Sequence, residues 1–379
     1  MLTGRPHSWS ASRRVRNREI RRQREEHGRQ AVAVLPIHYP KELLTALGVL
    51  AVELWGPPGP PRGDDAGRVQ TYVCAVVRNA LAFLAGGHAD EVDGVLFPHT
   101  CDSIQQLATL CTDLGGWKKP AFTFLHPRGA DRPSARRFLE AELRRLAGTL
   151  ETFTGRTLTD ERLAGALQLH AEVDAARAAL LEARARLPLD DTGLYQLLRR
   201  GEWRWPADHL AELEAARATL ADRPVQRGVP VLVTGYVPEP AALLSTLNGA
   251  GAFVAADDYA AVGRRVVRAP PPPGSDPWRA LVDRSFAAPP CPTRGADTGV
   301  RMAHLAGLAE RSGARGVLVH VQKFCEPELF DVPAIRETFA ARGLPVLVLE
   351  GELEGTLSGQ AVTRLEAFAE LLQGARGAA

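Results

Sequence analysis

Cysteine can take part in several kinds of chemistry, and the chain contains five cysteines. Each can be a small buried apolar residue, a metal ligand in its thiolate form, or a nucleophile. In a reducing compartment structural disulfides are not expected. The roles therefore depend on where the cysteines fall, at Cys74, Cys101, Cys111, Cys291 and Cys325.

Three of the cysteines lie where a folded chain can present sulfur to a ligand. Cys101 and Cys325 each follow a short apolar run that predicts a buried strand. The carboxyl ends of such strands form the ligand-binding edge of an open parallel sheet. Cys74 lies near the start of a helix predicted over 71–84, where the helix dipole favours a thiolate.

Three thiolates of this kind suit an iron–sulfur cluster. Cys74, Cys101 and Cys325 are far apart in sequence and include no Cys-x-x-Cys pair, so their spacing alone supports a metal site only weakly. Burial without any ligand is the alternative that the spacing leaves open.

The other two cysteines are predicted to play no part in a cluster. Cys111 follows apolar residues on a predicted helix and is expected in the core. Cys291 lies between Pro290 and Pro292 in a loop, as either a fourth ligand or an exposed thiol. The missing spacing support favours the exposed thiol.

A carboxylate and three histidines are expected near the same sheet edges. Glu53 ends a predicted strand over 49–54 and is our candidate catalytic residue, with a solvated strand end as the alternative. His38, His99 and His320 lie in or at the ends of predicted strands, where a neutral imidazole can donate to a ligand oxygen. Each can equally be a core histidine.

Other binding chemistries find little support. The sequence has no Gly-x-x-x-x-Gly-Lys-Ser/Thr motif, so ATP binding by a P-loop is excluded. The segment 56–61 is rich in proline, which lacks the amide donors of a phosphate cradle, and we interpret it as a rigid loop. Trp203 and Trp205 are interpreted as packing residues or as contacts to another subunit.

Strands and helices alternate around these residues. Apolar, β-branched runs predict strands near residues 30, 49, 94 and 121, separated by helical segments, except after 121. This alternation is typical of a parallel sheet with helices on both faces. The pattern is helical from 133 to 223, and strands resume at 229.

The second half of the chain resembles the first, because segments 39–48 and 94–102 are similar in residue order to 237–247 and 316–326. We therefore predict an α/β fold with two related doubly wound parallel-sheet domains and a helical insertion. The predicted parts are a basic N-terminal helix at 1–29, a first α/β domain at 30–130, the insertion at 131–225 and a second α/β domain at 226–379.

Composition excludes several classes of protein. The net charge of +2 is too small for a nucleic-acid-binding surface, although the N-terminal segment is rich in arginine. The sequence lacks a membrane-spanning apolar run and a secretory signal, so we expect a cytoplasmic protein with no membrane partner. A mitochondrial transit peptide is the alternative, and Glu19, Glu25 and Glu26 argue against it.

These motifs resemble the family of 2-hydroxyacyl-CoA dehydratases and benzoyl-CoA reductases over about residues 30 to 375, with a D-component-type, cluster-binding subunit as the match. The matching pieces are CAVVRN at 74–79, FPHTCD at 97–102, FCEPELFD at 324–331, LPVLVLE at 344–350, SGQ at 358–360 and TRLEAF at 363–368. Their order and spacing agree across both predicted domains, which makes the set specific.

The resemblance implies a 4Fe-4S cluster between two α/β domains, with Cys74, Cys101 and Cys325 at the three ligand positions. It leaves the fourth iron open or bound by a non-protein ligand. In the dehydratases of this family, a separate ATP-dependent activator supplies one electron, and the acyl-CoA thioester becomes a ketyl radical anion that expels the 2-hydroxyl. The missing P-loop agrees with an ATPase that is another protein.

The resemblance therefore implies the iron–sulfur subunit of a 2-hydroxyacyl-CoA dehydratase, a lyase that converts a 2-hydroxyacyl-CoA to a 2-enoyl-CoA. The implied partners are a homologous second subunit, the activator and the acyl-CoA substrate. The alternatives are a benzoyl-CoA reductase-type subunit, which is an oxidoreductase, and a non-enzymatic α/β ligand-binding protein. A double-cubane branch of the family needs more thiolates than these five cysteines offer.

Overall fold

The computed structural model describes residues 9–55, 69–70, 72–220, 228–272, 274–353 and 356–374. The chain forms two compact units. Unit 1 comprises Met1–Val173, Arg200–His209 and Ala269–Ala287, and unit 2 comprises Asp174–Arg199, Leu210–Arg268 and Ala288–Ala379. The segment 56–61 and residues 1–8 of the predicted basic helix lie outside the described residues.

Unit 1 contains a four-stranded parallel sheet. Its strands are β1 (Gln30–Val34), β2 (Val49–Glu53), β3 (Gly94–His99) and β4 (Ala121–Leu125), in the order β2-β1-β3-β4. Val34 is in register with both Glu53 and Leu96. Because every pairing is parallel, the carboxyl ends of all four strands meet at one edge.

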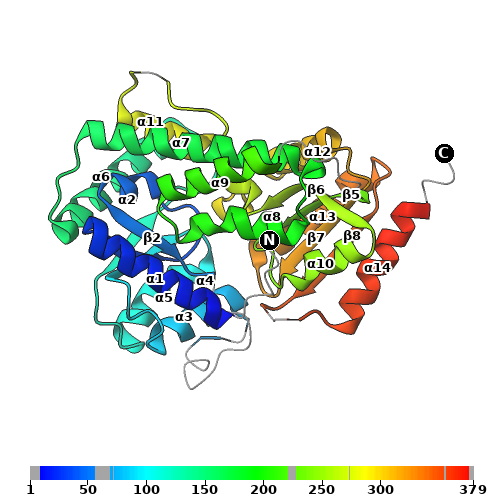
Figure 1. The fold of residues 1–379 in the computed structure, drawn as a ribbon, viewed down its shortest axis with the longest axis horizontal. Coiled ribbons are helices and arrows are strands. Elements are labelled where there is room, and N and C mark those ends of the chain that lie inside the picture. The colour runs from blue at the N-terminus through cyan, green and yellow to red at the C-terminus, as the bar shows by residue number, and fades with distance from the viewer. Residues whose placement is uncertain are drawn as a thin grey trace. The chain divides into compact units, whose positions relative to one another are not determined.

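Helices pack on both faces of this sheet (Figure 1). The helical segments that lie wholly in unit 1 are α1 (Trp9–His27), α2 (Lys41–Ala46), α3 (Ala75–Ala85), α4 (Asp102–Gln105), α5 (Leu107–Thr109), η2 (Leu110–Leu114), α6 (Pro133–Thr154), η4 (Arg200–Glu202) and α11 (Pro277–Ala287). One face of the sheet packs on α2, α6 and α11 through a buried cluster that includes Val34, Leu96 and Phe124. On the other face, α1 contacts β1 and β2.

The predicted helix that carries Cys111 is instead three short segments, α4, α5 and η2, the last with π-helical hydrogen bonding. Their buried residues are Ile104, Leu107 and Cys111, at the helical spacing of three and four. The apolar periodicity therefore identified the buried stripe correctly. It carried no information about the change of hydrogen-bond pattern, because the buried residues keep helical spacing through all three segments.

Unit 2 contains a second four-stranded parallel sheet. Its strands are β5 (Val229–Gly235), β6 (Ala252–Tyr259), β7 (Gly316–Gln322) and β8 (Val346–Gly351), in the order β6-β5-β7-β8. Its α-helices are α8 (Asp191–Arg199), α10 (Ala242–Gly249), α12 (Thr298–Ser312), α13 (Glu326–Ala340) and α14 (Gly359–Gly374). Short 3₁₀ turns are η3 (Arg184–Arg186), η5 (Gly263–Arg265) and η6 (Pro292–Arg294).

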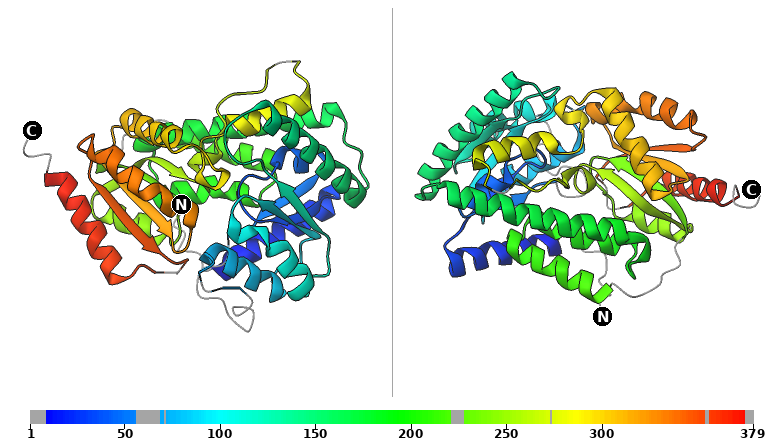
Figure 2. Two further views of the ribbon diagram at one scale, coloured as in Figure 1. Left: turned by 180° about the vertical axis from the view of Figure 1, so that it is seen from behind. Right: turned by 90° about the horizontal axis from the view of Figure 1, so that it is seen from above.

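Four of these helices form two pairs against the sheet. α10 and α14 pack together, and so do α12 and α13, and each helix also contacts strands. Figure 2 shows α14, in red, running along its side of the sheet. Buried strands with helices on both sides agree with the continuous apolar runs of β5 and β7.

The two sheets have the same strand order, which confirms the predicted fold class of two parallel-sheet α/β domains. α2 follows β1 as α10 follows β5, as the similarity of segments 39–48 and 237–247 suggested. Cys101 follows β3 as Cys325 follows β7. The two cysteines therefore occupy equivalent places in the two sheets.

The segment from 133 to 220 is largely helical, through α6, α7 (Asp160–Ala183), η3, α8, η4 and α9 (Pro206–Leu220). α7 passes from unit 1 to unit 2 after Val173, and α9 passes after His209. The four-part division at residues 29, 130 and 225 stays a prediction, which we keep as a proposal. No helix of the described residues is long and apolar enough to cross a membrane.

A buried polar network connects the basic helix α1 to the residues directly before α9. Glu19 accepts hydrogen bonds from Arg22 at 2.8 Å, Gln23 at 2.7 Å and Arg204 at 2.6 Å. The guanidinium of Arg29 lies 3.7 Å from the ring centroid of Trp205, which is buried, as the packing interpretation expects. Although burial alone would raise the pKa of Glu19, these donors and the charge of Arg204 hold it below its usual range.

This network predicts a pH-dependent contribution to stability. Because the pKa of Glu19 is lower in the folded chain, its contribution is present above the unfolded value of about 4.3 and is lost as pH falls through the folded value. At pH 7 Glu19→Gln should lower the free energy of unfolding of unit 1 by about 2 kcal/mol. Denaturant titrations should show this difference shrinking between about pH 5 and pH 3.

The matched control is Glu26→Gln on the same helix, where the carboxylate is exposed and pairs with Arg22 at 3.5 Å. It should cost less than about 0.5 kcal/mol. A Glu19→Gln deficit that stays constant down to pH 3 would contradict the assigned network.

Candidate metal centre

Cys101 lies just beyond β3 and caps the start of α4 with an extended backbone. The backbone amides of Ser103 and Ile104 donate hydrogen bonds to its sulfur. Burial raises the pKa of the Cys101 thiol to about 12, and the neighbouring sulfur of Cys74 adds to this rise, while the amides and Arg128 oppose it. Without a metal, Cys101 is therefore a protonated thiol at neutral pH.

Cys74 caps the start of α3 in the same way. Its sulfur accepts hydrogen bonds from the backbone amides of Val76 and Val77 and from the hydroxyl of Ser103, and the charge of Arg78 lies nearby. Burial raises the pKa of the Cys74 thiol despite these groups. Ser103 donates to both sulfurs, through its backbone amide and its hydroxyl, so Cys74 and Cys101 form a pair within unit 1.

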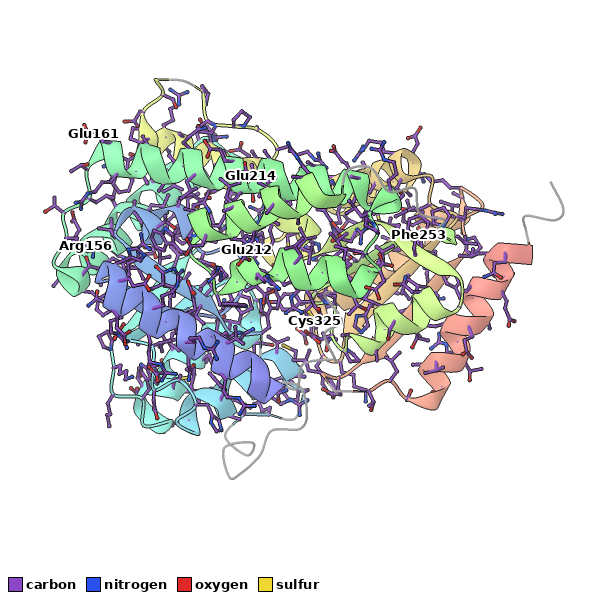
Figure 3. All side chains as sticks on the ribbon, viewed as in Figure 1. Arg156, Glu161, Glu212, Glu214, Phe253 and Cys325 are labelled. Carbon is purple, nitrogen blue, oxygen red and sulfur yellow. The ribbon has the colours of Figure 1, made fainter. Side chains whose placement is uncertain are left out.

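Cys325 caps α13 in unit 2 and is 7% exposed. The residue is labelled in Figure 3. The residue before it, Phe324, has a φ of 63°, which is strained for a bulky side chain. Among the described residues, only Ile37 and His38 share this left-handed backbone without being glycine, and they follow β1 at the edge of the other sheet. The backbone strain therefore collects at the two candidate ligand-binding edges.

The surroundings of Cys74 and Cys101 fit thiolate ligation of a cluster. Amide donors at two helix starts and the charges of Arg78 and Arg128 favour negative sulfur, whereas burial prevents it unless a cation is present. No group of three or more His, Cys, Asp or Glu side chains in the described part of the chain is arranged to hold a metal ion. That Cys325 joins the other two cysteines stays a prediction.

The remaining cysteines differ from each other. Cys111 is buried, as expected, and burial alone raises the pKa of its thiol to about 12. Cys291 is fully buried, so the expected exposed thiol is wrong. Its loop folds back on unit 2, where its sulfur lies 3.1 Å from the hydroxyl of Thr293 and accepts a hydrogen bond from Arg264 at 3.6 Å.

Glu53 ends β2 at the edge where Cys101 follows β3. It is 1% exposed, so the alternative of a solvated strand end is wrong. The hydroxyl of Tyr39 donates to its Oε1 at 2.7 Å, and the indole of Trp55 donates to its Oε2 at 3.0 Å. Both carboxylate oxygens are thus oriented by neutral donors.

The three histidines have different surroundings. His320 is buried within β7, its Nδ1 lies 3.2 Å from the Tyr259 hydroxyl, and burial lowers its pKa to about 4. His320 is therefore a neutral core histidine. Burial also lowers the pKa of His99 at the end of β3. The ring of His38 lies 5.8 Å from that of His126, between centroids.

Sequence reasoning missed a buried arginine–carboxylate cluster in unit 2, which we call the buried ion cluster. Its members are Thr234, Asp258, Arg264, Cys291, Arg301, Glu328 and Asp331. The double aspartate at the end of the apolar strand β6 was the available signal, because buried carboxylates require cationic partners. The partners themselves come from distant segments, which no local pattern reveals.

The fold and the paired thiols define an α/β protein whose candidate metal ligands lie at the carboxyl edges of parallel sheets. Comparison with known sequences gives its family. Residues 36–372 match the family described as 2-hydroxyglutaryl-CoA dehydratase, D-component. The chain therefore belongs to this family, as the resemblance of its motifs indicated.

Several characterised relatives match along nearly the whole chain. The chain is 26% identical to the β subunit of lactoyl-CoA dehydratase from Anaerotignum propionicum, over 92% of this chain and 93% of the relative. It is 24% identical to the β subunit of (R)-2-hydroxyglutaryl-CoA dehydratase from Acidaminococcus fermentans, over 91% and 93%. It is 25% identical to one of the subunits of benzoyl-CoA reductase from Thauera aromatica, over 84% of this chain and 84% of the relative.

Proposed function

We propose that this chain is the iron–sulfur subunit of a 2-hydroxyacyl-CoA dehydratase that forms a 2-enoyl-CoA. The observation that carries the proposal is the pair of Cys74 and Cys101, each at a helix start and each with amide hydrogen bonds to its sulfur. Family membership and relatives named as dehydratase subunits supply the reaction class. A benzoyl-CoA reductase-type subunit is the second candidate, on the relative from Thauera aromatica.

Cys74, Cys101 and Cys325 are the proposed ligands of a 4Fe-4S cluster. Such a cluster, when bound, supplies one-electron transfer and a Lewis-acidic iron. The protein's part is to lose three thiol protons and to hold the resulting charge. Amides at the starts of α3 and α4 do so for Cys74 and Cys101, and Cys325 has the equivalent place at α13.

Glu53 is the proposed catalytic residue. Conversion of a 2-hydroxyacyl-CoA to a 2-enoyl-CoA removes the hydroxyl from C2 and a proton from C3, so the reaction requires a base. Glu53 is a buried carboxylate at the sheet edge of unit 1, oriented by Tyr39 and Trp55. We assign to it the acceptance of the C3 proton.

The ligand assignment predicts which cysteines the iron depends on. Anaerobically prepared wild-type protein should be brown and contain about four iron and four sulfide per chain. Cys74→Ala, Cys101→Ala and Cys325→Ala should each lose most of that iron, because each removes a thiolate. Cys111→Ala, also buried, is the matched control and should keep it.

Iron and sulfide analysis, together with the visible absorption spectrum, measures the cluster content of the wild type and of the four cysteine variants. Full iron in Cys325→Ala would show that the ligands are wrongly assigned. A colourless wild-type protein from anaerobic cells would instead favour the non-enzymatic ligand-binding alternative.

The role of Glu53 predicts a separation of activity from cluster content. In the assembled enzyme, Glu53→Gln should lower kcat by about 100-fold or more, because the amide cannot accept the proton. Iron content should equal that of the wild type. Glu19→Gln, which changes another buried carboxylate of unit 1, is the control and should retain kcat within about threefold. Equal kcat for Glu53→Gln and the wild type would remove Glu53 from the mechanism.

The proposed cluster role and the missing P-loop predict that activity depends on partner proteins. The described chain offers candidate cluster ligands, and its sequence has no P-loop, so activity should require a homologous second subunit and a reduced, ATP-hydrolysing activator. A 2-hydroxyacyl-CoA should then give the 2-enoyl-CoA, measured by chromatography of the CoA esters. Conversion of benzoyl-CoA to a cyclic diene would select the reductase alternative. Turnover by the purified chain alone, without ATP, would contradict the partner assignment.

A further inference from the structure

The first turn of α13, which carries Cys325, is anchored by Arg264 of η5. Both terminal nitrogens of Arg264 bind the carboxylate of Glu328, the third residue of α13, and the Nη2–Oε2 distance is 3.0 Å. The Nε of the same guanidinium donates to Asp258 at the end of β6, at 2.9 Å. One side chain therefore connects the helix start to the sheet edge.

Glu328 is joined to Cys325 through the backbone. The amides of Glu328 and Leu329 both donate to the carbonyl oxygen of Cys325, at 3.1 and 3.0 Å. On its other side, the amide of Cys325 donates to the carbonyl oxygen of Gln322, the last residue of β7, at 3.0 Å. The strained Phe324 lies between these two anchors, so the position of Cys325 depends on both of them.

Arg301 completes the anchor from α12. It donates to Asp258 at 2.8 Å, to Asp331 of α13 at 3.1 Å and to the hydroxyl of Thr234 at 3.1 Å. Burial by itself disfavours the charge of Asp258, but the two arginines hold its pKa well below its usual range. The carboxylate that receives both guanidiniums thus stays ionised across the neutral range.

Stability alone does not account for the buried ion cluster. Burying charges carries a desolvation cost that ion pairing roughly offsets, and apolar residues of similar volume often give equal or greater stability. What an arginine fork adds over apolar packing is a fixed orientation of the group it binds. In unit 2 that group is the first turn of the helix that Cys325 caps.

We propose that Arg264 is a positioning residue for Cys325: it fixes the start of α13 through Glu328 and so aims the thiol for metal ligation. The proposal rests on the proposed cluster function. Cys291 belongs to the same anchor, because its sulfur accepts a hydrogen bond from Arg264, and this accounts for its burial without a ligand role.

Arg264→Lys tests the proposal, because lysine keeps the charge but cannot bind Glu328 and Asp258 as a fork. Arg184→Lys is the matched control. Arg184 is equally buried in unit 2 and binds Asp257 at 3.0 Å, but within the described residues it makes no hydrogen bond to α13. Both substitutions therefore disturb a buried arginine–aspartate pair of one unit.

The first measurement uses the metal-free full-length chain and needs no activity. Iodoacetamide labelling of Cys325 is followed by peptide mass spectrometry. In Arg264→Lys the labelling rate should rise about tenfold, the effect of losing one charge-assisted hydrogen bond on local opening. In Arg184→Lys it should stay within about twofold of the wild type. Equal rates in the two variants would overturn the proposal.

Three further variants keep the test decisive if Arg264→Lys does not fold. Glu328→Gln is isosteric and should raise the labelling rate of Cys325 about threefold to tenfold. The double variant Arg264→Gln/Glu328→Gln replaces the ion pair by two amides that can bond each other, and it should label more slowly than Arg264→Gln alone. No such rescue would show that the two side chains do not act on Cys325 together.

The second measurement uses the reconstituted chain. Arg264→Lys should shift the electron paramagnetic resonance spectrum and midpoint potential of the bound cluster, whereas Arg184→Lys should leave both unchanged. A wild type that binds no iron would reject the cluster function, while the labelling rates would still decide whether Arg264 positions Cys325. Failure of the cluster function and failure of the positioning role of Arg264 are therefore distinguishable.

Discussion

Parallel strand pairing is the constraint on which the arrangement of this protein depends. In each unit the chain places its second strand on one side of the first and its third strand on the other, so the direction of winding reverses between β1 and β3 and between β5 and β7. Loops that leave such a switch point diverge and create space at the carboxyl edge. Cys101 and Cys325 each follow the third strand at this point. The strained backbones of His38 and Phe324 lie at the same edges.

Burial at these edges makes a charged sulfur costly. It raises the pKa of the Cys74 and Cys101 thiols, so that neither sulfur is charged without a cation, although amides of α3 and α4 are in place to stabilise the charge. In such surroundings a free thiolate is costly, and a bound cation would lower that cost. The proposed ligand role is thus consistent with the local electrostatics of the metal-free chain.

Much of this arrangement was predictable from local sequence patterns. Apolar runs located the strands, and their repeated order gave two parallel sheets with Cys101 and Cys325 in equivalent places. The patterns failed where long-range contacts decide. Cys291, between two prolines, looked exposed but is buried because Arg264, 27 positions earlier in the chain, binds its sulfur. For Glu53, the alternative of a solvated strand end is wrong, because the nearby side chains of Tyr39 and Trp55 hold both of its oxygens in a buried position.

The two units share a topology, but the carboxylates at their sheet edges have different hydrogen-bond partners. Glu53 pairs in register with Val34 on the central strand of unit 1, and Asp257 pairs with Val233 on that of unit 2. Glu53 accepts hydrogen bonds from a phenol and an indole, which orient both of its carboxylate oxygens.

Asp257 binds the guanidinium of Arg184, and its neighbour Asp258 binds those of Arg264 and Arg301. The two guanidiniums hold the pKa of Asp258 well below its usual range, whereas burial raises the pKa of Asp257 despite Arg184. Asp258 is therefore suited to anchoring η5 and α12 through a permanent charge.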